Sequence, residues 1–407
     1  MQKKLLAIAI AAAVTAPVAA RADVTVYGQM HYSYDYVMAQ EDEGATGVAR
    51  YSRIGFKGAE DLGGGLKGVW QIEGQINNDS NTMGWRNTFV GLAGDWGTVL
   101  AGRHDTPYKI STQKLDFFTD RAADYNNIIG SYNGYLVGDT RAPQTIAYVL
   151  PNLSGFTGAL AYVDHYFDST PGSDCSLRLL GGSPANCYSD ESDTALSAML
   201  MYDNAGFFAT VAYEWAQGYN LLNAVNSGVF VDTNAAANAA AVALGGRSAS
   251  VVFENPELNM WKVGLGYTFG GTTIGGIWEN IDLDGGKIHV TTVPATGAAT
   301  TTTVDTKSED RNAYYLTAQH VFGNNVIKGY YGWADDIQDT DNTGTDAWAV
   351  GYDYNFSKRT TLYALYTMVQ NDDSANYTAN KAQGVGSGYT NPGDDVDVVS
   401  VGVIHKF

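Results

Sequence analysis

The chain has 407 residues, of which 45% are hydrophobic, 12% aromatic and 16% charged. Its 43 acidic residues outnumber 24 basic ones, giving a formal charge of −19. This balance argues against nucleic-acid binding, which needs clustered Lys and Arg. The 27 tyrosines and 47 glycines favour strands and turns, and the aromatic content argues against disorder.

The N-terminal segment has the order of a secretory signal. Lys3 and Lys4 precede an apolar run over residues 5–14, and the small–x–small triplet Ala20-Arg21-Ala22 follows. We therefore predict a signal peptide at residues 1–22 and a mature domain at residues 23–407. The alternative, a membrane anchor, is disfavoured because the run is too short to span a bilayer. Loss of this segment lowers the formal charge from −19 to −22.

Apolar and polar residues alternate along many later segments. Clear examples are residues 24–36, 261–269 and 348–356. A period of two predicts strands with one apolar and one polar face. A soluble β-sandwich would bury the apolar faces in a shared core, whereas a membrane barrel would turn them toward lipid. Aromatic residues at strand ends, and small or charged residues on the polar faces, favour the barrel.

The connections between these strands alternate between short and long. Seven short turns are predicted near residues 61–65, 93–97, 151–155, 204–206, 270–272, 323–325 and 356–359. Eight long connections are predicted near residues 38–48, 77–84, 105–139, 167–192, 216–257, 283–310, 335–345 and 370–394. Fifteen connections imply sixteen strands, so we predict an all-β, antiparallel up-and-down transmembrane barrel.

Cys175 and Cys187 are the two cysteines, and they lie in one polar segment. In an exported protein this pair predicts a local disulfide, with two free thiols as the alternative. No pattern of metal ligands accompanies them.

The final alternating strand, residues 396–407, ends on Phe407. We expect it to pair with the first strand, because closure of a barrel removes the open edge. Phe407 is therefore the candidate barrel-closing residue.

Several short motifs resemble one family, the general trimeric porins of Gram-negative outer membranes. They are Val26-Tyr27-Gly28, Ser52–Gly58, Arg86–Leu92, Ala101-Gly102-Arg103 and His405-Lys406-Phe407. The resemblance covers the mature chain and is strongest near its two ends. It implies a sixteen-stranded barrel, usually a homotrimer without cofactor, through which ions and small hydrophilic solutes cross the outer membrane.

In that family the third outer loop folds into the lumen, where its acidic residues face arginines on the barrel wall. By motif, Arg53, Arg86 and Arg141 match those wall arginines. Their sequence phase agrees, since each is opposite in phase to neighbouring apolar residues. On the loop, which lacks the tip sequence of the enterobacterial members, we predict Asp116, Asp120 and Asp124 as the facing carboxylates.

The resulting hypothesis is a passive outer-membrane channel whose charged constriction sets selectivity. The arginines could instead serve only to hold the loop, and the barrel could act mainly as an adhesin or anchor. An enzyme is disfavoured because the six histidines are dispersed and no nucleophile elbow or P-loop is present. The acidic loops are expected to be solvated near lipopolysaccharide.

Overall fold

The computed structural model of the chain describes residues 23–39, 43–77, 82–164, 166, 194–217, 248–254, 257–284, 287–293, 300–305, 308–379 and 391–407. The predicted signal peptide, Cys175 and Cys187 lie outside the described residues. Among the helices in the described residues, none is long and apolar enough to serve as a membrane-spanning helix.

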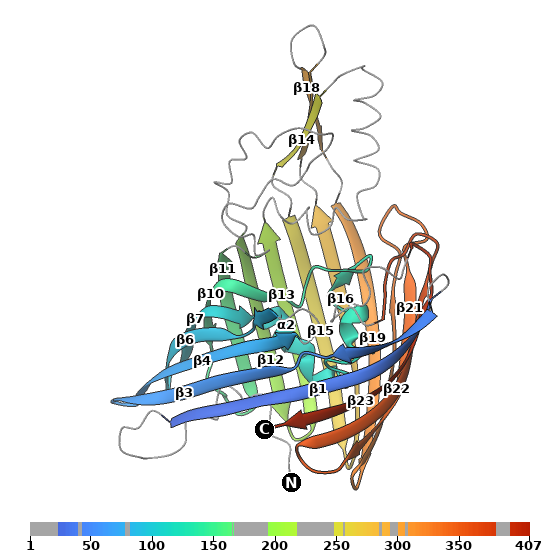
Figure 1. Cartoon of the computed structure of the whole chain (residues 1–407). Helices are drawn as coiled ribbons and strands as arrows, with labels where there is room; N and C mark the ends of the chain where they lie inside the picture. The colour runs from blue at the N-terminus through green and yellow to red at the C-terminus, as the bar shows by residue number, and fades with distance from the viewer. Residues whose placement is uncertain are drawn as a thin grey trace.

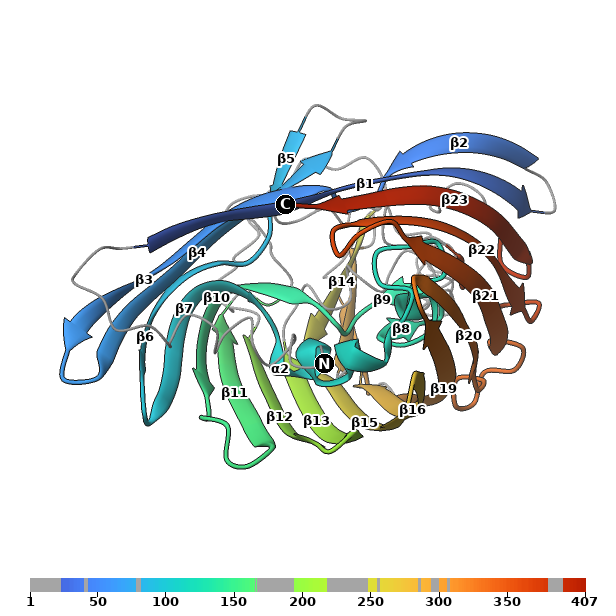
Figure 2. The ribbon, with the colours of Figure 1, turned by 90° about the horizontal axis from the view of Figure 1, so that it is seen from below.

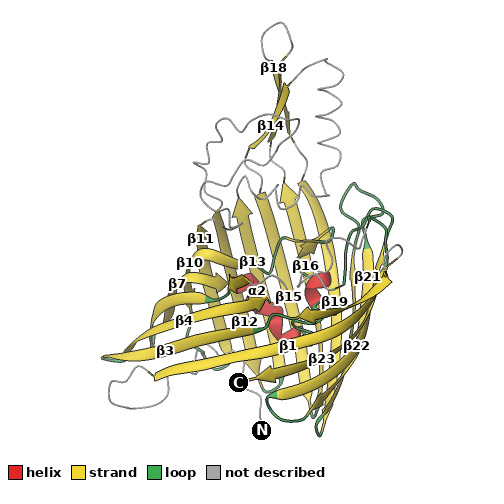
Figure 3. Cartoon of the chain, viewed as in Figure 1, coloured by secondary structure: helices red, strands yellow, loops and turns green. Residues whose placement is uncertain are grey.

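Most of the described chain forms one antiparallel sheet (Figures 1 and 3). Its strands are β1 (Asp23–Ala39), β2 (Glu43–Ala49), β3 (Arg53–Gly63), β4 (Leu66–Asn77), β5 (Thr82–Trp85), β6 (Thr88–Gly94), β7 (Gly97–Asp105), β10 (Arg141–Val149), β11 (Phe156–Asp164), β12 (Thr194–Asn204), β13 (Phe207–Gln217), β15 (Glu257–Phe269), β16 (Thr272–Asp284), β19 (Ser308–Phe322), β20 (Asn325–Ala334), β21 (Thr345–Asn355), β22 (Thr360–Asn371) and β23 (Val396–Lys406).

These eighteen strands make sixteen barrel positions. β2 and β3 pair with successive parts of β1 and occupy one position together, and β5 and β6 do the same beside β4. β1 also pairs with β23, so the sheet closes on itself. The predicted sixteen-stranded antiparallel barrel is thereby confirmed, and the soluble-sandwich alternative is wrong.

The first described strand and residue 407 meet at this seam. The backbone N–H of Gly28 donates to the carbonyl of Phe407, and the N–H of Phe407 donates to the carbonyl of Gly28, both at 3.1 Å. A Cβ on Gly28 would lie 2.5 Å from both the Phe407 ring and the Arg53 carbonyl oxygen. Glycine at this position therefore permits the close approach of the last residue.

The barrel is apolar outside and polar inside. On β15, Trp261, Leu265 and Phe269 are exposed, whereas Lys262, in the opposite phase, is fully buried. Exposed phenylalanines lie beside four of the short turns, at positions 207, 269, 322 and 356. This outward surface has the character of a lipid-facing band with aromatic residues at its edge.

The long connections differ in part from prediction. β1 continues to Ala39 and β2 begins at Glu43, so the first connection is shorter than residues 38–48. The connection predicted at 77–84 is also shorter, since β5 begins at Thr82. Within the segments predicted as loops at 216–257 and 283–310, β14 (Ser248–Glu254), β17 (Lys287–Val293) and β18 (Thr300–Asp305) form a separate three-stranded sheet. This sheet projects beyond the long-loop end of the barrel (Figure 1).

Candidate functional site

The connection from β7 to β10, residues 106–140, runs inside the barrel, and we call it the inner loop. It contains α2 (Pro107–Thr112), two short 3₁₀ turns (Gln113–Leu115 and Tyr125–Asn127) and the paired strands β8 (Ser131–Tyr132) and β9 (Tyr135–Leu136). Seen along the barrel in Figure 2, α2, β8 and β9 lie within the ring of strands.

The sequence of the inner loop explains its local structure. Thr106 caps α2 by accepting a hydrogen bond from the Lys109 N–H at 3.3 Å, and Pro107 occupies the first turn, where it needs no hydrogen-bond partner. Farther along, Leu115, Phe118 and Ile129 are buried. Burial of such side chains against the wall stabilises the loop inside the lumen.

Arg53 begins β3 and contacts the tip of the inner loop. Its Nη1 lies 2.9 Å from Asp120 Oδ2, and Gln29 Nε2 donates to the same oxygen at 3.2 Å. Asp120 has a backbone φ of +62°, a conformation that Asp adopts more readily than most residues. The loop therefore turns sharply where it contacts the wall.

Arg86 lies between β5 and β6 and pairs with a wall carboxylate. Its Nε donates to Glu73 Oε1, while the Tyr27 hydroxyl donates to Glu73 Oε2 at 2.8 Å. The guanidinium carbon lies 5.6 Å from the centroid of the Tyr51 ring. Arg86 is thus held against the wall by an ion pair and an aromatic face.

Arg141 begins β10 and pairs at the root of the inner loop. Its Nη2 lies 2.9 Å from Asp105 Oδ1, and its Nε donates to Asn87 Oδ1 at 2.8 Å. Lys109 Nζ lies 3.4 Å from the same Asp105 oxygen. The strand register shifts between Ala142 and Thr145. The alternation of the later residues of β10 therefore does not fix the side on which Arg141 lies, and the position of Arg141 follows from these contacts instead.

The three predicted carboxylates have different roles in the structure. Asp120 contacts Arg53, as described above. Asp116 accepts from the backbone N–H of Phe118 at 2.9 Å, and Asp124 accepts from those of Asp120 and Asn126 at 2.9 and 3.0 Å. Asp116 and Asp124 therefore shape the loop tip, and neither forms an ion pair with a wall arginine.

A second charged cluster follows directly along the loop. Arg121 Nη2 lies 3.0 Å from Asp353 Oδ2 on β21, and Lys328 Nζ on β20 lies 2.8 Å from the same oxygen. Arg121 also lies over the Tyr363 ring, 4.7 Å from its centroid. The adjacent residues Asp120 and Arg121 thus attach the loop tip to two parts of the wall.

Sequence reasoning did not identify Glu73, Asp353 or Lys328 as functional candidates. A signal was present for Asp353 and Lys328, because each is a charged residue in the polar phase of an alternating strand. Glu73 could have been found in the same way on β4, where it lies opposite Gly55 in register.

The far side of the inner loop is anchored by the buried carboxylate of Glu279 on β16. It accepts from the Gly130 N–H at 2.8 and 2.9 Å and from the Tyr108 hydroxyl at 2.9 Å. Arg311 Nη2 and Lys262 Nζ lie 3.2 and 3.5 Å from its oxygens. We call these residues the loop anchor.

Exposure differs between the two sides of the inner loop. In the loop anchor, the side chains of Glu279, Lys262 and Arg311 are 0% exposed. Those of Arg53, Arg86 and Arg141 are 22%, 12% and 16% exposed. Water in the lumen therefore reaches the three arginines.

Over the described ranges, no three His, Cys, Asp or Glu side chains converge as a metal site.

The chain resembles known proteins along its length. A family model described as Gram-negative porin matches residues 7–296 and 284–374. The major outer membrane protein P.IA of Neisseria meningitidis serogroup B is 27% identical, with all of both chains covered.

Two solved structures share the fold. The anion-selective porin from Comamonas acidovorans has a TM-score of 0.70 at 22% identity, covering 95% of this chain and 100% of that one. OmpT of Vibrio cholerae, in a trimer form, has a TM-score of 0.61 at 13% identity, covering 95% and 99%.

Proposed function

The chain belongs to the Gram-negative porin family, and from that premise we propose that its three wall arginines, Arg53, Arg86 and Arg141, form the selectivity constriction of the channel. The protein is an outer-membrane β-barrel through which ions and small hydrophilic solutes diffuse passively. The observation that carries the proposal is the partial exposure of these three ion-paired arginines beside a loop whose far side is fully buried.

The constriction acts through its electric field. Charged side chains lining a narrow aqueous pore set ion preference by their local potential. Four cations, the wall arginines and Lys109, face three carboxylates, those of Glu73, Asp105 and Asp120. The cluster of Arg121, Lys328 and Asp353 adds two cations to one carboxylate. Both clusters carry excess positive charge.

We therefore propose a preference for anions, although the whole chain is acidic. Of the other two loop carboxylates, Asp124 opposes this preference once it ionises near its pKa of about 6, whereas Asp116 opposes it only weakly. Burial, followed by the neighbouring Asp124 carboxylate, raises the pKa of Asp116 well above its usual range. The Comamonas porin with the same fold is itself described as anion-selective.

The experiment is a planar-bilayer recording of the triple variant Arg53→Ala, Arg86→Ala, Arg141→Ala. A unit charge contributes about 1 kcal/mol at 4 Å in water, which corresponds to about fivefold in a permeability ratio. We expect the anion-to-cation permeability ratio, calculated from the reversal potential in a salt gradient, to fall by at least this factor. A double variant on an exposed short turn, Lys358→Ala with Arg359→Ala, is the control. Wild-type selectivity in the triple variant would show that the arginines only hold the loop.

We also propose that residues 1–22 direct export and that the protein assembles as a homotrimer. The trimer form of the Vibrio OmpT fold supports the second proposal. Conductance steps arriving in groups of three would support the trimer, and single independent steps would contradict it. The contact of the acidic loops with lipopolysaccharide and the Cys175–Cys187 disulfide stay predictions.

A further inference from the structure

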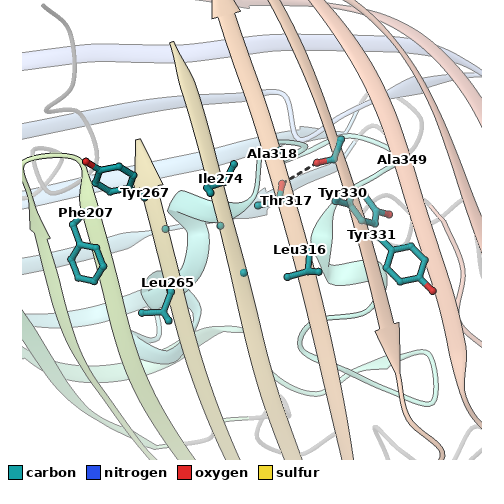
Figure 4. A pocket seen from close by; sticks show the side chains of 14 residues that line it. Phe207, Leu265, Tyr267, Ile274, Leu316, Thr317, Ala318, Tyr330, Tyr331 and Ala349 are labelled. Atoms are coloured by element: carbon teal, nitrogen blue, oxygen red, sulfur yellow. Dashed lines mark hydrogen bonds between the residues drawn. The ribbon is translucent and has the colours of Figure 1, made fainter. Parts of the chain in front are cut away.

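A groove crosses the outer face of the barrel over β15, β16, β19 and β20 (Figure 4). Its volume is about 710 Å³, and it is open along the outer surface. Gly276, Ala318 and Gly329 are outward-facing and supply its floor, and larger exposed side chains such as Leu316 and Tyr331 supply its sides. Because three neighbouring strands present only hydrogen or methyl groups here, the surface is hollowed where a barrel wall is otherwise covered by large apolar side chains.

A polar pair of side chains lies just beyond one end of this groove, beside the short turns. The next outward position on β19 after Ala318 is His320, whose Nδ1 lies 2.9 Å from Thr272 Oγ1 on β16. The His320 ring stacks on Phe322, with 5.7 Å between centroids. Short turns of outer-membrane barrels face the periplasm. The groove thus runs from an aromatic and polar border on that side into the apolar band.

We propose that this groove binds one acyl chain of a phospholipid in the periplasmic leaflet, with His320 and Thr272 beside its phosphate. The proposal uses only the placement of the barrel in the outer membrane. A slender chain can reach the floor formed by Gly276, Ala318 and Gly329, whereas the convex wall of a second barrel cannot. An imidazole N–H and a hydroxyl are suitable donors to a phosphate oxygen.

The lumen side of the same wall is closed. Leu115 of the inner loop packs against Gly266 and Gly275, where an added Cβ would lie 2.9 and 2.6 Å from Leu115 Cδ2. The groove therefore opens only outward, toward lipid. A chain bound there fills the hollow that the small outward residues leave, and van der Waals contact of this kind is a main source of association within a membrane.

The first test is native mass spectrometry of the full protein with palmitoyl-oleoyl phosphatidylethanolamine added stepwise. We expect one retained phospholipid per protomer in the wild type and its loss in Ala318→Trp, which fills the groove. Ala364→Trp is the matched control, since Ala364 is also exposed and outward-facing on β22. Retained single-channel conductance shows that a variant is folded, and Ala318→Leu replaces Ala318→Trp if the larger side chain prevents folding.

The second test concerns the polar end. His405 on β23 makes the same contact with Thr360 Oγ1, at 2.9 Å. The two outward positions before it on that strand are the larger Val403 and Val401, whereas those before His320 are Ala318 and Leu316. We expect His320→Ala to weaken phospholipid binding about threefold, the effect of one polar contact in a membrane, and His405→Ala to leave it unchanged. Three results would overturn the proposal. They are retention of the lipid by the folded groove-filling variant, equal weakening of binding in both histidine variants, and absence of retained lipid in the wild type.

Discussion

Asp120 and Asp124 lie four residues apart at the tip of the inner loop, yet their environments shift their pKa values in opposite directions. Burial alone would raise the pKa of Asp120, but the Arg53 and Arg86 guanidinium groups bring it below its usual value. Burial raises the pKa of Asp124 to about 6, against the opposing effect of backbone N–H groups from Asn126 and Asp120. Asp120 therefore carries a fixed charge at neutral pH, and Asp124 titrates in the accessible range.

We predict that anion preference falls as pH rises from 5 to 7, because ionisation of Asp124 adds negative charge near Asp120 and Lys109. The change should be at most about fivefold in the permeability ratio, the value for a charge at 4 Å. Reversal potentials at pH 5, 6, 7 and 8 measure it. In the Asp124→Asn variant this pH-dependent change in anion preference, the step, should disappear. In the Asp116→Asn variant it should remain. A persistent step in Asp124→Asn would contradict this assignment.

The same titration affects stability with a defined sign. Because the folded-state pKa of Asp124 is above its usual value, the folded protein binds more protons than the unfolded chain between about pH 4 and 6. The stabilising contribution of the protonated group is present at low pH and is lost as pH rises through about 6.

At this scale the sequence predicts the arginines better than their partners. Arg53 is placed by strand phase, since a charged side chain cannot face lipid cheaply. The position of its partner Asp120 depends on the irregular path of the inner loop, where the sequence has no regular alternation from which the path could be predicted. Asp116 and Asp124 have the right chemistry but bond to the loop backbone instead. For Arg141, a register shift separates it from the apolar residues used for its phase, so the phase argument fails there and the family motif alone supports the prediction.

The inner loop as an element is stabilised chiefly from its buried side. Glu279 receives hydrogen bonds from the loop at Gly130 and Tyr108 and ion pairs with two wall cations. Since all these charges are removed from water, each depends on its partners being present. The loop anchor therefore fixes the loop position from which the exposed arginines define the passage.

We predict that Glu279→Ala loosens the inner loop and destabilises the protein by about 3–5 kcal/mol, the usual cost of breaking a buried ion pair. Thermal unfolding followed by circular dichroism measures the loss. Single-channel recordings should show a larger and more variable conductance. Lys114→Ala is the control, because its ion pair with Asp203 is 36% and 41% exposed and such pairs contribute about 0–1 kcal/mol. Equal effects of the two substitutions would exclude an anchoring role for Glu279.

Strands were predictable as elements because alternation and short turns mark them along the sequence. The transmembrane strands and the closure at β23 follow from that signal. β14, β17 and β18 escaped prediction because their Thr- and Ser-rich sequences lack the apolar alternation that a lipid-facing strand requires. Strands outside the membrane are free of that constraint, so sequence periodicity identifies them poorly.

At the scale of the whole molecule, exposed acidic residues of the long connections lie apart from two cation-rich clusters inside the barrel. Acidic side chains such as Asp335, Asp372 and Asp373 are exposed in the long connections. Inside the barrel, two cations pair with one carboxylate at both Asp353 and Asp105. An ion approaching from outside meets the acidic potential before the basic one. The distance over which each potential acts depends on salt, since the Debye length is about 30 Å at 0.01 M and about 10 Å at 0.1 M.

We predict that anion preference is weaker at 10 mM salt than at 100 mM, the reverse of simple screening of a single charged site. At about 10 mM the acidic loops repel anions over tens of ångströms, and at about 100 mM their reach shrinks while the ion-paired arginines still act at contact distance. Reversal potentials in gradients centred on the two concentrations measure this. Replacing Asp335, Asp372 and Asp373 with Asn should raise anion preference mainly at low salt. If anion preference instead falls steadily with added salt in both the wild type and the triple Asn variant, the acidic loops do not influence permeation.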